Sequence, residues 1–393
     1  MFKLEFSSLT DKDAIQLSAE KLSSHLEDWE KDIWQFVSDW FNPSVACMSV
    51  FTSGSTAAPK LMQHSKGAMM NSARLTCEAL HMRQNDKALL CLPANKISGM
   101  MMIARSIVNK MDLYCIRPSS NPLGEIHDKD KFDLAAFTPT QLFEVDKDSK
   151  KLKRLEKINK LLIGGEGMPP TLLNILQKLS NSAYATFGMT ETISHIALRK
   201  LNGKDAADWF TTIGSIAVHT DERNCLIIEA PELGVRHLIT NDEVHLISST
   251  EFKWLGRKDN LINSGGVKIY PEKIEEQLKP LIQLPFFIAG IESNRTGQEV
   301  AIAIEKATFT LKEANELKKR FEILGKLYCP KTILTKGEMY YGEFVNGRLV
   351  KGYSKDVDPF GFFSYSKTEK GIKTPVEVQQ GEEFFNPLLS TKQ

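Results

Sequence analysis

The segment Thr52–Thr56, TSGST, places four hydroxyl side chains and one glycine directly after an apolar, β-branched run. A loop of this composition exposes backbone N–H groups and hydroxyls together, which suits a polyphosphate, and Lys60 would add a point charge. It is not the GxxxxGK[ST] phosphate loop, because the lysine follows proline and no Ser or Thr comes after it. Two interpretations stay open for this loop alone: a phosphate site, or a plain connection from a strand to a helix that we expect to run to about His81.

Ala57 and Ala58 occupy positions where phosphate loops often have glycine. If the backbone requires a positive φ at position 57, alanine is on the order of 1 kcal/mol less favourable there than glycine. We therefore expect Ala57 to stiffen or displace the loop without abolishing phosphate binding.

Two glycine-containing loops follow predicted strands further along the chain. Gly164–Gly165–Glu166 would let a flat ring approach the backbone, where side chains would otherwise block it. The segment Phe187–Glu191, FGMTE, combines an aromatic ring, a bare glycine, a hydroxyl and a carboxylate. Neither loop by itself specifies a nucleotide site.

Three polar motifs in the second half of the chain extend this pattern. Asp242, in TND, places a carboxylate at a predicted turn, where it suits ribose hydroxyls. Arg257 and Asp259, in GRKDN, offer a guanidinium and a second carboxylate, and Gly265–Gly266 open a further region. Asp242 or Arg257 taken singly would equally suit a surface ion pair.

These six motifs, in this order and spacing, resemble the adenylate-forming superfamily of acyl-CoA synthetases, luciferases and peptide-synthetase adenylation domains. The resemblance runs from about residue 45 to about residue 335. TSGSTAAPK resembles the superfamily's TSGSTGxPK except at Ala57, FGMTE resembles YGxTE, and GRKDN resembles GRxDD. GGVKIYPEKIE resembles GGxxIxPxEIE.

The resemblance implies that the chain activates a carboxylic acid with ATP and Mg²⁺, giving an acyl-adenylate and pyrophosphate, and then transfers the acyl group to CoA. Thr190 would face the α-phosphate, and Glu191 would hold the magnesium ion. Asp259 would be the hinge of a small domain, and Gly265 and Gly266 would pass the pantetheine arm of CoA. The ATP-binding residues that the resemblance implies are Thr52, Ser53, Gly54, Ser55, Thr56, Lys60, Gly164, Gly165, Glu166, Phe187, Gly188, Asp242 and Arg257.

Two runs, YATFGMTETISHIALRKLNG and WLGRKDNLINSGGVKIYPEKIE, look most like the o-succinylbenzoate–CoA ligases of menaquinone biosynthesis. An acid with a second carboxylate needs a cation or several N–H donors, because an unpaired buried carboxylate is strongly unfavourable. We assign the acid pocket to Lys96, Met189 and His195. The alternatives are a solvated loop lysine at position 96 and a satisfied core histidine at position 195.

The superfamily's C-terminal lysine motif, TxxGK, is missing after LYCPKTIL. Arg348 lies at about the right distance and keeps the charge, although its shape and reach differ from those of lysine. Lys351 is three residues on, and TEKGIK at 368–373 resembles the motif but lies much further along. We take Arg348 and Lys351 as catalytic candidates, against the alternative that EFVNGRLV is only a β-hairpin with Asn346–Gly347 as its turn.

Apolar segments alternate with helical patterns through the first half of the chain, as in VACMSVFT, KALLCLP, MDLYCIRPS, FDLAAFTP and INKLLIGG. This alternation predicts an α/β fold whose large N-terminal domain has mainly parallel sheets covered by helices. A turn-rich region from about residue 208 predicts a small antiparallel β subdomain, and residues 11–40 read as helical. The predicted organisation is a large domain at 1–256, a hinge at 257–260, a small mobile α+β domain at 261–353 and a tail of unknown role at 354–393.

The composition excludes several classes of protein. With 393 residues, 42% apolar and 25% charged, the chain is typical of a soluble protein with more than one domain. A net charge of +1 gives no sign of a nucleic-acid surface or a polybasic membrane patch. The N-terminal residues show no apolar signal segment. The most apolar stretch, SGMMMIARSIV, is too short to span a membrane. The six cysteines are scattered along the chain, which favours reduced thiols over disulfide bonds. We expect a cytoplasmic enzyme, with a homodimer as an open possibility.

Two other functions stay open. Ala57 and the missing lysine motif would fit an adenylation-defective homologue that binds nucleotides or acyl-adenylates. The same motifs also suit an adenylation enzyme that loads a carrier protein instead of CoA. Pyrophosphate exchange separates the first alternative from an acid–CoA ligase, and the choice of acyl acceptor separates the second.

Overall fold

The computed structural model describes residues 1–51, 61–142, 145–165, 168, 170–282, 284, 286–293, 296–304, 316–317, 319–324, 328, 330, 332–335, 341–345 and 348–352. At residues 51, 170, 292, 322 and from 332 onward only the backbone is described. The described chain forms two compact units. The first contains residues 1–51, 61–240 and 244–254, and the second contains 241–243 and the residues from 255 onward.

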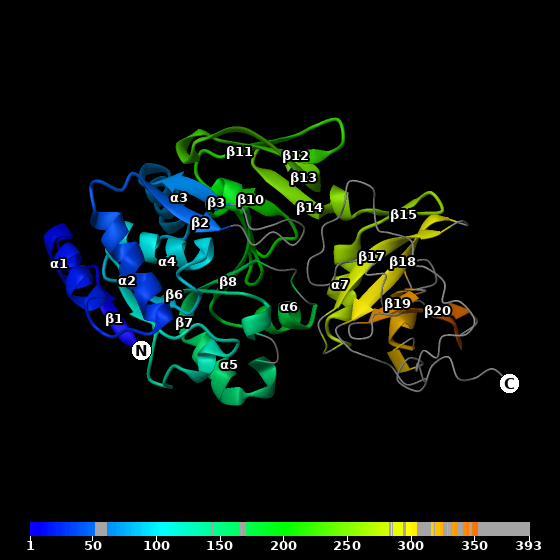
Figure 1. Cartoon of the computed structure of the whole chain (residues 1–393), viewed down its shortest axis with the longest axis horizontal. Helices are drawn as coiled ribbons and strands as arrows, with labels where there is room; N and C mark the ends of the chain where they lie inside the picture. Colours follow the sequence, from blue (N-terminus) through cyan, green and yellow to red (C-terminus); the bar gives the residue numbers. More distant parts are fainter. Residues whose placement is uncertain are drawn as a thin grey trace. The chain divides into compact units, whose positions relative to one another are not determined.

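One twelve-stranded sheet organises the first unit, and its strands follow the order β1-β5-β4-β6-β7-β8-β9-β10-β14-β13-β12-β11 (Figure 1). The strands are β1 (Phe2–Glu5), β4 (Lys87–Leu90), β5 (Asp112–Cys115), β6 (Phe132–Phe137), β7 (Ile158–Ile163), β8 (Ser182–Gly188), β9 (His195–Lys200), β10 (Phe210–Thr212), β11 (Ala217–Thr220), β12 (Cys225–Ala230), β13 (Val235–Ser248) and β14 (Glu251–Arg257). Strands β5, β4, β6, β7 and β8 are parallel neighbours. The predicted α/β class with parallel strands is confirmed.

The predicted antiparallel region is also present, but it is not a separate sheet. Strands β8 and β9, β9 and β10, β10 and β14, and β11 and β12 pair antiparallel. They extend the parallel strands within one continuous hydrogen-bonded sheet. Alternating burial along β12 is typical of strands with one solvated face.

Helices cover the parallel part of this sheet on both faces. The connection β4–α4–β5 runs along the sheet in the opposite direction to β6–α5–β7 and β7–α6–β8. Because such crossovers are right-handed, α4 lies on one face and α5 and α6 lie on the other, as Figure 1 shows. The helices of this unit are α1 (Asp11–Leu22), α2 (Asp28–Phe41), α3 (Lys66–Ala79), α4 (Ile97–Val108), α5 (Ser149–Glu156) and α6 (Pro170–Leu176).

The helical region predicted at 11–40 is confirmed, and it consists of two helices. Thr10 caps α1 by accepting from the N–H of Asp13, whose carboxylate accepts from the N–H of Thr10. Helix α1 ends at Ser23, and α2 begins after Glu27, whose N–H donates to the carboxylate of Glu30 at 3.0 Å. Side chains near the N-terminus of each helix thus bond to backbone N–H groups there.

The segment after Lys60 does not have the predicted structure, which was a helix that follows the loop directly. Instead of continuing as a helix, residues Leu61–Ser65 form β3, which pairs antiparallel with β2 (Cys47–Phe51). This two-stranded sheet does not join the parallel sheet. Helix α3 begins only at Lys66, capped by the hydroxyl of Ser65. A strand rather than a helix therefore follows residue 60.

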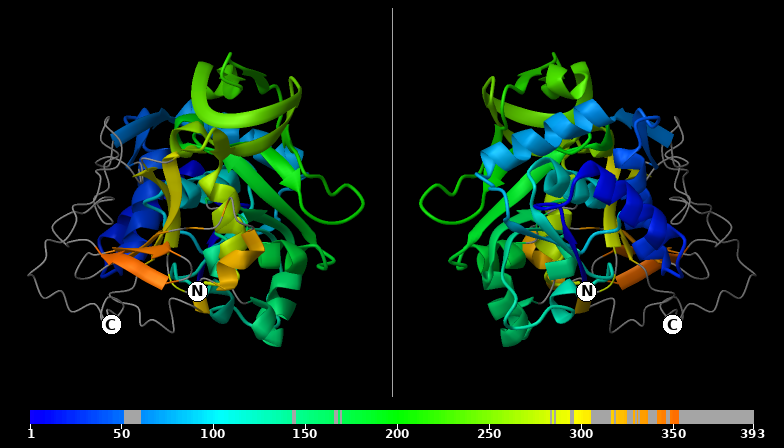
Figure 2. Two further views of the ribbon diagram at one scale, coloured as in Figure 1. Left: turned by 90° about the vertical axis from the view of Figure 1, so that its right-hand side faces the viewer. Right: turned by 90° about the vertical axis from the view of Figure 1, so that its left-hand side faces the viewer.

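Aromatic and aliphatic side chains fill the core of the first unit. Phe2 packs against Trp29 and Trp34, with ring centroids 5.6 and 5.9 Å apart, and Trp34 is buried. Helix α3, light blue in Figure 2, runs beside the green strands at the other end of the sheet. There Asn71 donates to the carbonyl of Glu232 at 2.8 Å.

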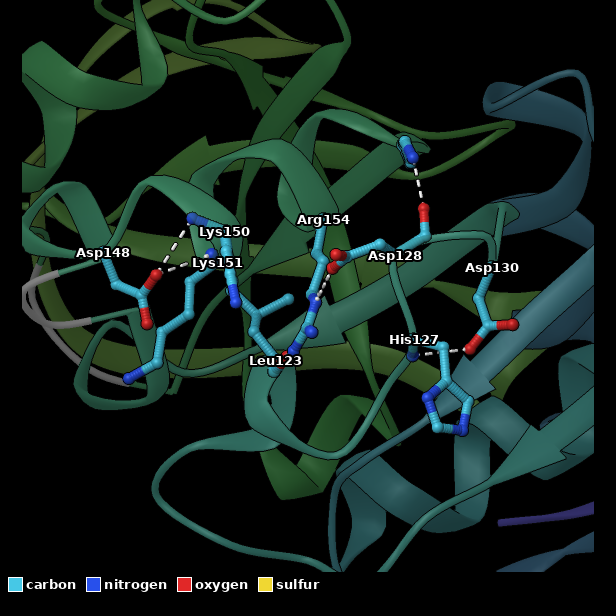
Figure 3. A network of polar contacts seen from close by, with 9 residues as sticks. Leu123, His127, Asp128, Asp130, Asp148, Lys150, Lys151 and Arg154 are labelled. Carbon is cyan, nitrogen blue, oxygen red and sulfur yellow. Dashed lines mark hydrogen bonds and ion pairs between the residues drawn. The ribbon is translucent and has the colours of Figure 1, made fainter.

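A polar network fastens the segment before β6 to helix α5 (Figure 3). Asp148 caps α5 by accepting from the N–H groups of Lys150 and Lys151 at 2.9 and 3.3 Å. From the same helix, Arg154 donates to the carboxylate of Asp128 at 2.6 Å and to the carbonyl of Leu123 at 2.9 Å. These bonds fix a loop that has little apolar surface of its own.

The second unit is a smaller α+β arrangement. Its sheet follows the order β16-β15-β18-β19-β20-β21, and β17 pairs with β18 on the other side. Helix α7 (Pro271–Leu278) packs on β17 and contributes Ile274 and Leu278 to a separate apolar core. The strands are β15 (Ile262–Ser264), β16 (Val267–Ile269), β17 (Phe286–Ser293), β18 (Gly297–Ile304), β19 (Thr332–Thr335), β20 (Tyr341–Val345) and β21 (Arg348–Gly352).

Two further sequence expectations bear on the described residues. No helix in the described part of the chain is long and apolar enough to cross a membrane. Cysteines 47, 77, 91, 115 and 225 are free thiols, and all but Cys47 are buried. The expectation of unpaired cysteines is confirmed for these five.

Candidate active site

The predicted site residues of the first unit gather at the carboxyl ends of its parallel strands. Gly164 directly follows β7, and the segment Gly188–Glu191 lies at and after the end of β8. Lys96 lies after β4, beside the place where successive connections reverse direction along the sheet. In open α/β sheets, ligands bind at the carboxyl ends of the strands next to such a reversal. The topology therefore puts these three segments at one edge of the sheet.

Gly164 and Gly165 are glycines for two different structural reasons. A Cβ on Gly164 would lie 2.0 Å from Oγ1 of Thr186, so any side chain would collide with β8. Gly165 has a φ of +86°, a conformation that side chains rarely adopt. Beside Gly165 the space is open, with no atom within 4 Å of the place where a Cβ would lie. The nucleotide-binding role of both glycines stays a prediction, and Glu166 lies outside the described residues.

Phe187 lies on the same edge and is half-buried. Its ring packs edge-on against Phe252, with centroids 5.0 Å apart and planes at 76°. Phe210 lies 5.6 Å away, so three aromatic rings from β8, β10 and β14 support one another. The packing fixes the position of Phe187 at the end of β8.

The predicted Thr190–Glu191 pair lies on a tight turn between β8 and β9. Gly188 permits this turn, because a Cβ there would lie 2.3 Å from the carbonyl oxygen of Ser194. The hydroxyl of Thr192 accepts from the N–H of Met189 at 3.1 Å and donates to the carbonyl of Ser194 at 2.8 Å. Thr190 is half-buried and Glu191 is exposed, so the turn presents both side chains at the sheet edge.

Ile193 ends this turn in a strained conformation. Its φ is 67° and its ψ is −51°, and the N–H of Ser194 bonds to the carbonyl of Thr192 at 2.7 Å. These values describe the rare γ-turn with positive φ. For a β-branched residue such a backbone costs on the order of 1–3 kcal/mol and is found mostly at functional sites. Ile193 is fully buried, so its packing holds the turn in place.

Sequence reasoning missed His64, which lies near Glu191. His64 is on β3 and is 8% exposed, and its Nε2 has no hydrogen-bond partner among the described residues. Burial lowers the pKa of His64, and the Glu191 carboxylate acts against that shift. A single histidine in QHS carries no motif, so the sequence alone gives no signal for it.

His195 is buried at the start of β9. It is 7% exposed, and its Nε2 and Nδ1 lie 3.1 Å from Oγ1 of Thr76 and 3.4 Å from Oγ of Ser194. Burial, followed by the charge of Arg105, lowers the pKa of His195 well below its usual value. Both ring nitrogens already have hydroxyl neighbours, so the alternative of a satisfied core histidine describes this residue better.

Lys96 keeps its place as a candidate. It is the residue that precedes α4, and its side chain is exposed at the carboxyl edge of the sheet. Met189, the third residue assigned to the acid pocket, is half-buried at the start of the Thr190–Glu191 turn. Their substrate-binding roles stay predictions.

The second unit brings three other predicted residues together. Arg257 donates from Nε and Nη2 to the two carboxylate oxygens of Asp259, at 3.1 and 2.9 Å. The hydrogen bonds that Arg257 donates to Asp259 raise the pKa of Arg257, and the charge of Asp242 acts in the same direction. Asp242 itself is buried. Asp259 is therefore hydrogen-bonded to Arg257, and Asp242 is within electrostatic reach of the same guanidinium; their nucleotide-binding and hinge roles stay predictions.

The segment predicted as a hinge is tied to helix α7. Gly256 has a φ of +147°, and a Cβ there would lie 2.6 Å from the ring of Tyr270. Asn260 donates to the carboxylate of Glu272 at 2.7 Å. The hinge role of Asp259 stays a prediction, because it concerns a motion.

Gly265 and Gly266 have a structural explanation of their own. They form the two-residue turn between β15 and β16, where Ser264 pairs with Val267. Their φ values are 59° and 84°, which is the pattern of a type I′ hairpin turn. The turn alone therefore accounts for both glycines, and their CoA-binding role stays a prediction.

The remaining predicted residues have limited structural description. Thr52, Ser53, Gly54, Ser55, Thr56 and Lys60 lie outside the described residues. Arg348 and Lys351 lie on β21, which pairs antiparallel with β20. The β-hairpin alternative for this segment agrees with that pairing, although its turn at 346–347 is not described.

The family of the chain follows from its sequence match. Residues 5–223, more than half of the chain, match the model of the AMP-binding enzyme family. This chain belongs to the AMP-binding enzyme family. Among curated AMP-binding enzymes it is similar to 2-succinylbenzoate–CoA ligase of Lactococcus lactis, with 26% identity over 253 residues, 59% of this chain and 54% of that protein. The 2-succinylbenzoate–CoA ligase of Haemophilus influenzae is 25% identical over 264 residues, 63% of this chain and 56% of that protein. The chain thus spans about half the length of these curated relatives.

Solved structures of AMP-binding enzymes share the fold. An acyl-CoA synthetase (AMP-forming)/AMP-acid ligase II-like protein from Dyadobacter fermentans is 30% identical, with a TM-score of 0.57, over 80% of this chain and 91% of that one. The o-succinylbenzoate CoA synthetase of Bacillus subtilis, in complex with ATP and magnesium ion, has a TM-score of 0.61. It is 19% identical over 89% of this chain and 81% of that one, a level that supports the fold alone.

Proposed function

We propose that this protein is an AMP-forming acid–CoA ligase that acts on o-succinylbenzoate. One observation carries the proposal: the Thr190–Glu191 pair stands on a strained turn, closed by several hydrogen bonds, at the carboxyl edge of the parallel sheet. Such an edge is where an α/β sheet binds a nucleotide. A strained turn that presents a hydroxyl and a carboxylate suits the binding of a phosphate and its metal ion.

A magnesium ion fits the chemistry of this edge. Glu191 is exposed, and no hydrogen bond or ion pair joins its carboxylate to the part of the chain that the structure describes. Those residues also contain no group of three or more His, Cys, Asp or Glu that could hold a metal unaided. Mg²⁺ is commonly bound by one or two carboxylates together with substrate phosphates. Bound there, it would neutralise charge on the phosphates of ATP.

The protein's own residues would do the rest of the first reaction. The bare backbone at Gly164 and Gly165 and the fixed ring of Phe187 would receive the adenine, and Asp242 with Arg257 would hold the ribose. The hydroxyl of Thr190 would bond to the α-phosphate. A carboxylate oxygen of the acid attacks the α-phosphorus, the bond to the pyrophosphate oxygen breaks, and pyrophosphate leaves.

The second reaction would release AMP. The sulfur of CoA attacks the acyl carbon of the adenylate, the bond to the AMP oxygen breaks, and a thioester forms. Gly265 and Gly266 are our candidates for passing the pantetheine arm, since their turn exposes bare backbone. Arg348 and Lys351 are our candidates for the charge that the superfamily supplies from its C-terminal lysine.

The relatives' names support o-succinylbenzoate as the acid. The second carboxylate of this acid requires a positively charged or N–H partner, and Lys96 offers a cation at the sheet edge. We do not include His195 in the proposed acid pocket, because both of its ring nitrogens already lie near hydroxyl groups. Lys96 therefore becomes the main candidate for acid recognition.

An acid panel tests the proposal. Purified protein is incubated with ATP, Mg²⁺ and each acid in turn, and both pyrophosphate exchange and CoA thioester formation are measured. We expect both with o-succinylbenzoate and neither with benzoate. ATP binding without exchange for any acid would favour an adenylation-defective homologue, which the missing TxxGK motif makes the leading alternative. Exchange with acyl transfer only to a phosphopantetheinyl carrier would favour a carrier-loading enzyme.

A further inference from the structure

Among the residues that the structure describes, Arg105 is a buried cation without an acidic partner. The residue lies on α4 and is 3% exposed, and within the described ranges no carboxylate forms an ion pair with it. Its Nη1 lies 3.7 Å from the sulfur of Met102, and its Nε has no hydrogen-bond partner among those residues. Burial lowers the pKa of Arg105 to about 10, so the guanidinium stays charged at neutral pH. Burying such a charge is unfavourable, and its position needs an explanation.

The guanidinium makes one strong hydrogen bond, and that bond reaches the turn that carries Thr190 and Glu191. Nη2 of Arg105 donates to Oγ of Ser194 over 2.5 Å. The N–H of Ser194 bonds to the carbonyl of Thr192, and its own carbonyl accepts from the Thr192 hydroxyl. Ser194 is thus held from both sides, by the turn and by α4.

The turn needs such a hold, because Ile193 is strained. A positive-φ γ-turn at a β-branched residue persists only where the surrounding structure over-determines it. The buried side of the turn holds Thr192 and Ile193, and its open side carries Glu191. If Ser194 were no longer held, the backbone at Ile193 could relax, and the part of the turn that carries Glu191 would move.

We propose that Arg105 is a positioning residue for acid adenylation: through Ser194 it keeps the Met189–Ser194 turn in the conformation that presents Thr190 and Glu191 to the nucleotide. This proposal rests on the function proposed above. A long, forked side chain explains why an arginine is buried here, since neither an apolar residue nor a short donor would reach from α4 to the serine hydroxyl.

Kinetics of the adenylation half-reaction test the proposal. In Arg105→Met and in Ser194→Ala, we expect kcat for pyrophosphate exchange to fall roughly tenfold or more, because small misplacements of reacting groups are costly. The KM for the acid should stay within about twofold. The double variant should lose no more than Arg105→Met, since both changes break one connection. Unchanged kcat in both single variants, or losses that multiply in the double variant, would overturn the proposal.

Arg154→Met is the matched control. Arg154 also donates to side-chain and backbone oxygens, but it fastens the loop before β6 rather than the Thr190–Glu191 turn. This variant should lower the unfolding midpoint and leave kcat unchanged. An equal loss of kcat in Arg154→Met would show that general destabilisation explains the effect, and the proposal would be wrong. If Arg105→Met fails to fold, Ser194→Ala carries the test.

Hydrogen–deuterium exchange of the peptide covering 188–195 gives a readout independent of activity. We expect faster amide exchange in this peptide for Arg105→Met and Ser194→Ala, and wild-type exchange for Arg154→Met. Wild-type protection in the first two variants would overturn the positioning role, even in an active enzyme. A wild-type protein that reacts with no acid would instead overturn the proposed function, and the exchange data would still decide whether Arg105 holds the turn.

Discussion

Arg257 and Asp259 form a two-point ion pair in the second unit, with N···O distances of 3.1 and 2.9 Å. Asp242 lies close enough to raise the pKa of the same guanidinium. Arg257 is therefore paired with Asp259, which we assign to the hinge, and lies within electrostatic reach of Asp242, which we assign to the ribose. A ribose that binds beside Asp242 would also meet this guanidinium.

This relationship gives the first prediction. Arg257→Gln should raise the KM for ATP roughly tenfold, because a hydrogen bond from a charged group contributes about 1.5–3 kcal/mol. Asp259→Asn is the matched variant, since it removes the partner and leaves the guanidinium in place, and it should change this KM by less than about threefold. Pyrophosphate-exchange kinetics at varied ATP measure both. Equal increases in the two variants would contradict the ribose-binding role of Arg257.

A second prediction concerns Lys96. Lys96→Ala should raise the KM for o-succinylbenzoate at least tenfold and leave the KM for ATP unchanged, because only the acid brings a second carboxylate. Lys87→Ala is the control, since Lys87 is also exposed but lies at the opposite end of β4. Steady-state kinetics with each substrate varied in turn give the comparison. Equal changes in both KM values would rule out acid recognition by Lys96.

A third prediction uses the burial of His195. Its folded pKa is depressed, so below the ordinary value near 6.5 the unfolded chain binds a proton that the folded chain does not. Its contribution to stability is therefore present above that pH and is lost as the pH falls below it, with a slope of at most about 1.4 kcal/mol per pH unit. His195→Gln should flatten the pH dependence of the free energy of unfolding between pH 7.5 and pH 5, which urea titrations measure.

The same variant separates the two interpretations of His195. A core histidine predicts an altered stability profile and an unchanged KM for the acid in the folded His195→Gln protein. A histidine that binds substrate predicts a raised KM. His127→Gln is a suitable control, because His127 lies in the loop held by Arg154 and Asp128, away from the sheet's carboxyl edge.

A fourth prediction concerns Ala57, which lies outside the described residues and is argued from the sequence. If the loop needs a positive φ there, Ala57→Gly should lower the KM for ATP, by about fivefold for a gain of about 1 kcal/mol. Ala58→Gly is the neighbouring control. An unchanged KM in Ala57→Gly would mean that alanine is neutral at this position.

The sequence predicts the parallel strands well because their chemistry is local. Strands β4, β6 and β7 are buried on both faces, so they read as short apolar runs. Strand β3, LMQHS, mixes apolar and polar residues beside a loop rich in helix-start signals, and only its pairing with β2 reveals it as a strand. Local pattern cannot supply that pairing.

Some site residues could likewise be found from local sequence motifs, whereas others depend on contacts between distant segments. Gly164, Gly188 and the Thr190–Glu191 pair belong to short motifs, so their places follow from the sequence. Arg105 lies 89 residues before Ser194, and neither local sequence predicts the hydrogen bond between them. The role of His195 stays open between two interpretations, because adjacency to a motif does not show which way a side chain faces.

The central claim is that this chain joins an acid to CoA at the expense of ATP. Its most direct test is mass-spectrometric detection of o-succinylbenzoyl-CoA after incubation with ATP, Mg²⁺, CoA and o-succinylbenzoate, with AMP measured in the same sample. The account predicts thioester and AMP in equal amounts, and neither product with the Glu191→Ala variant. Binding of ATP with no AMP and no thioester from the folded wild-type protein would contradict it.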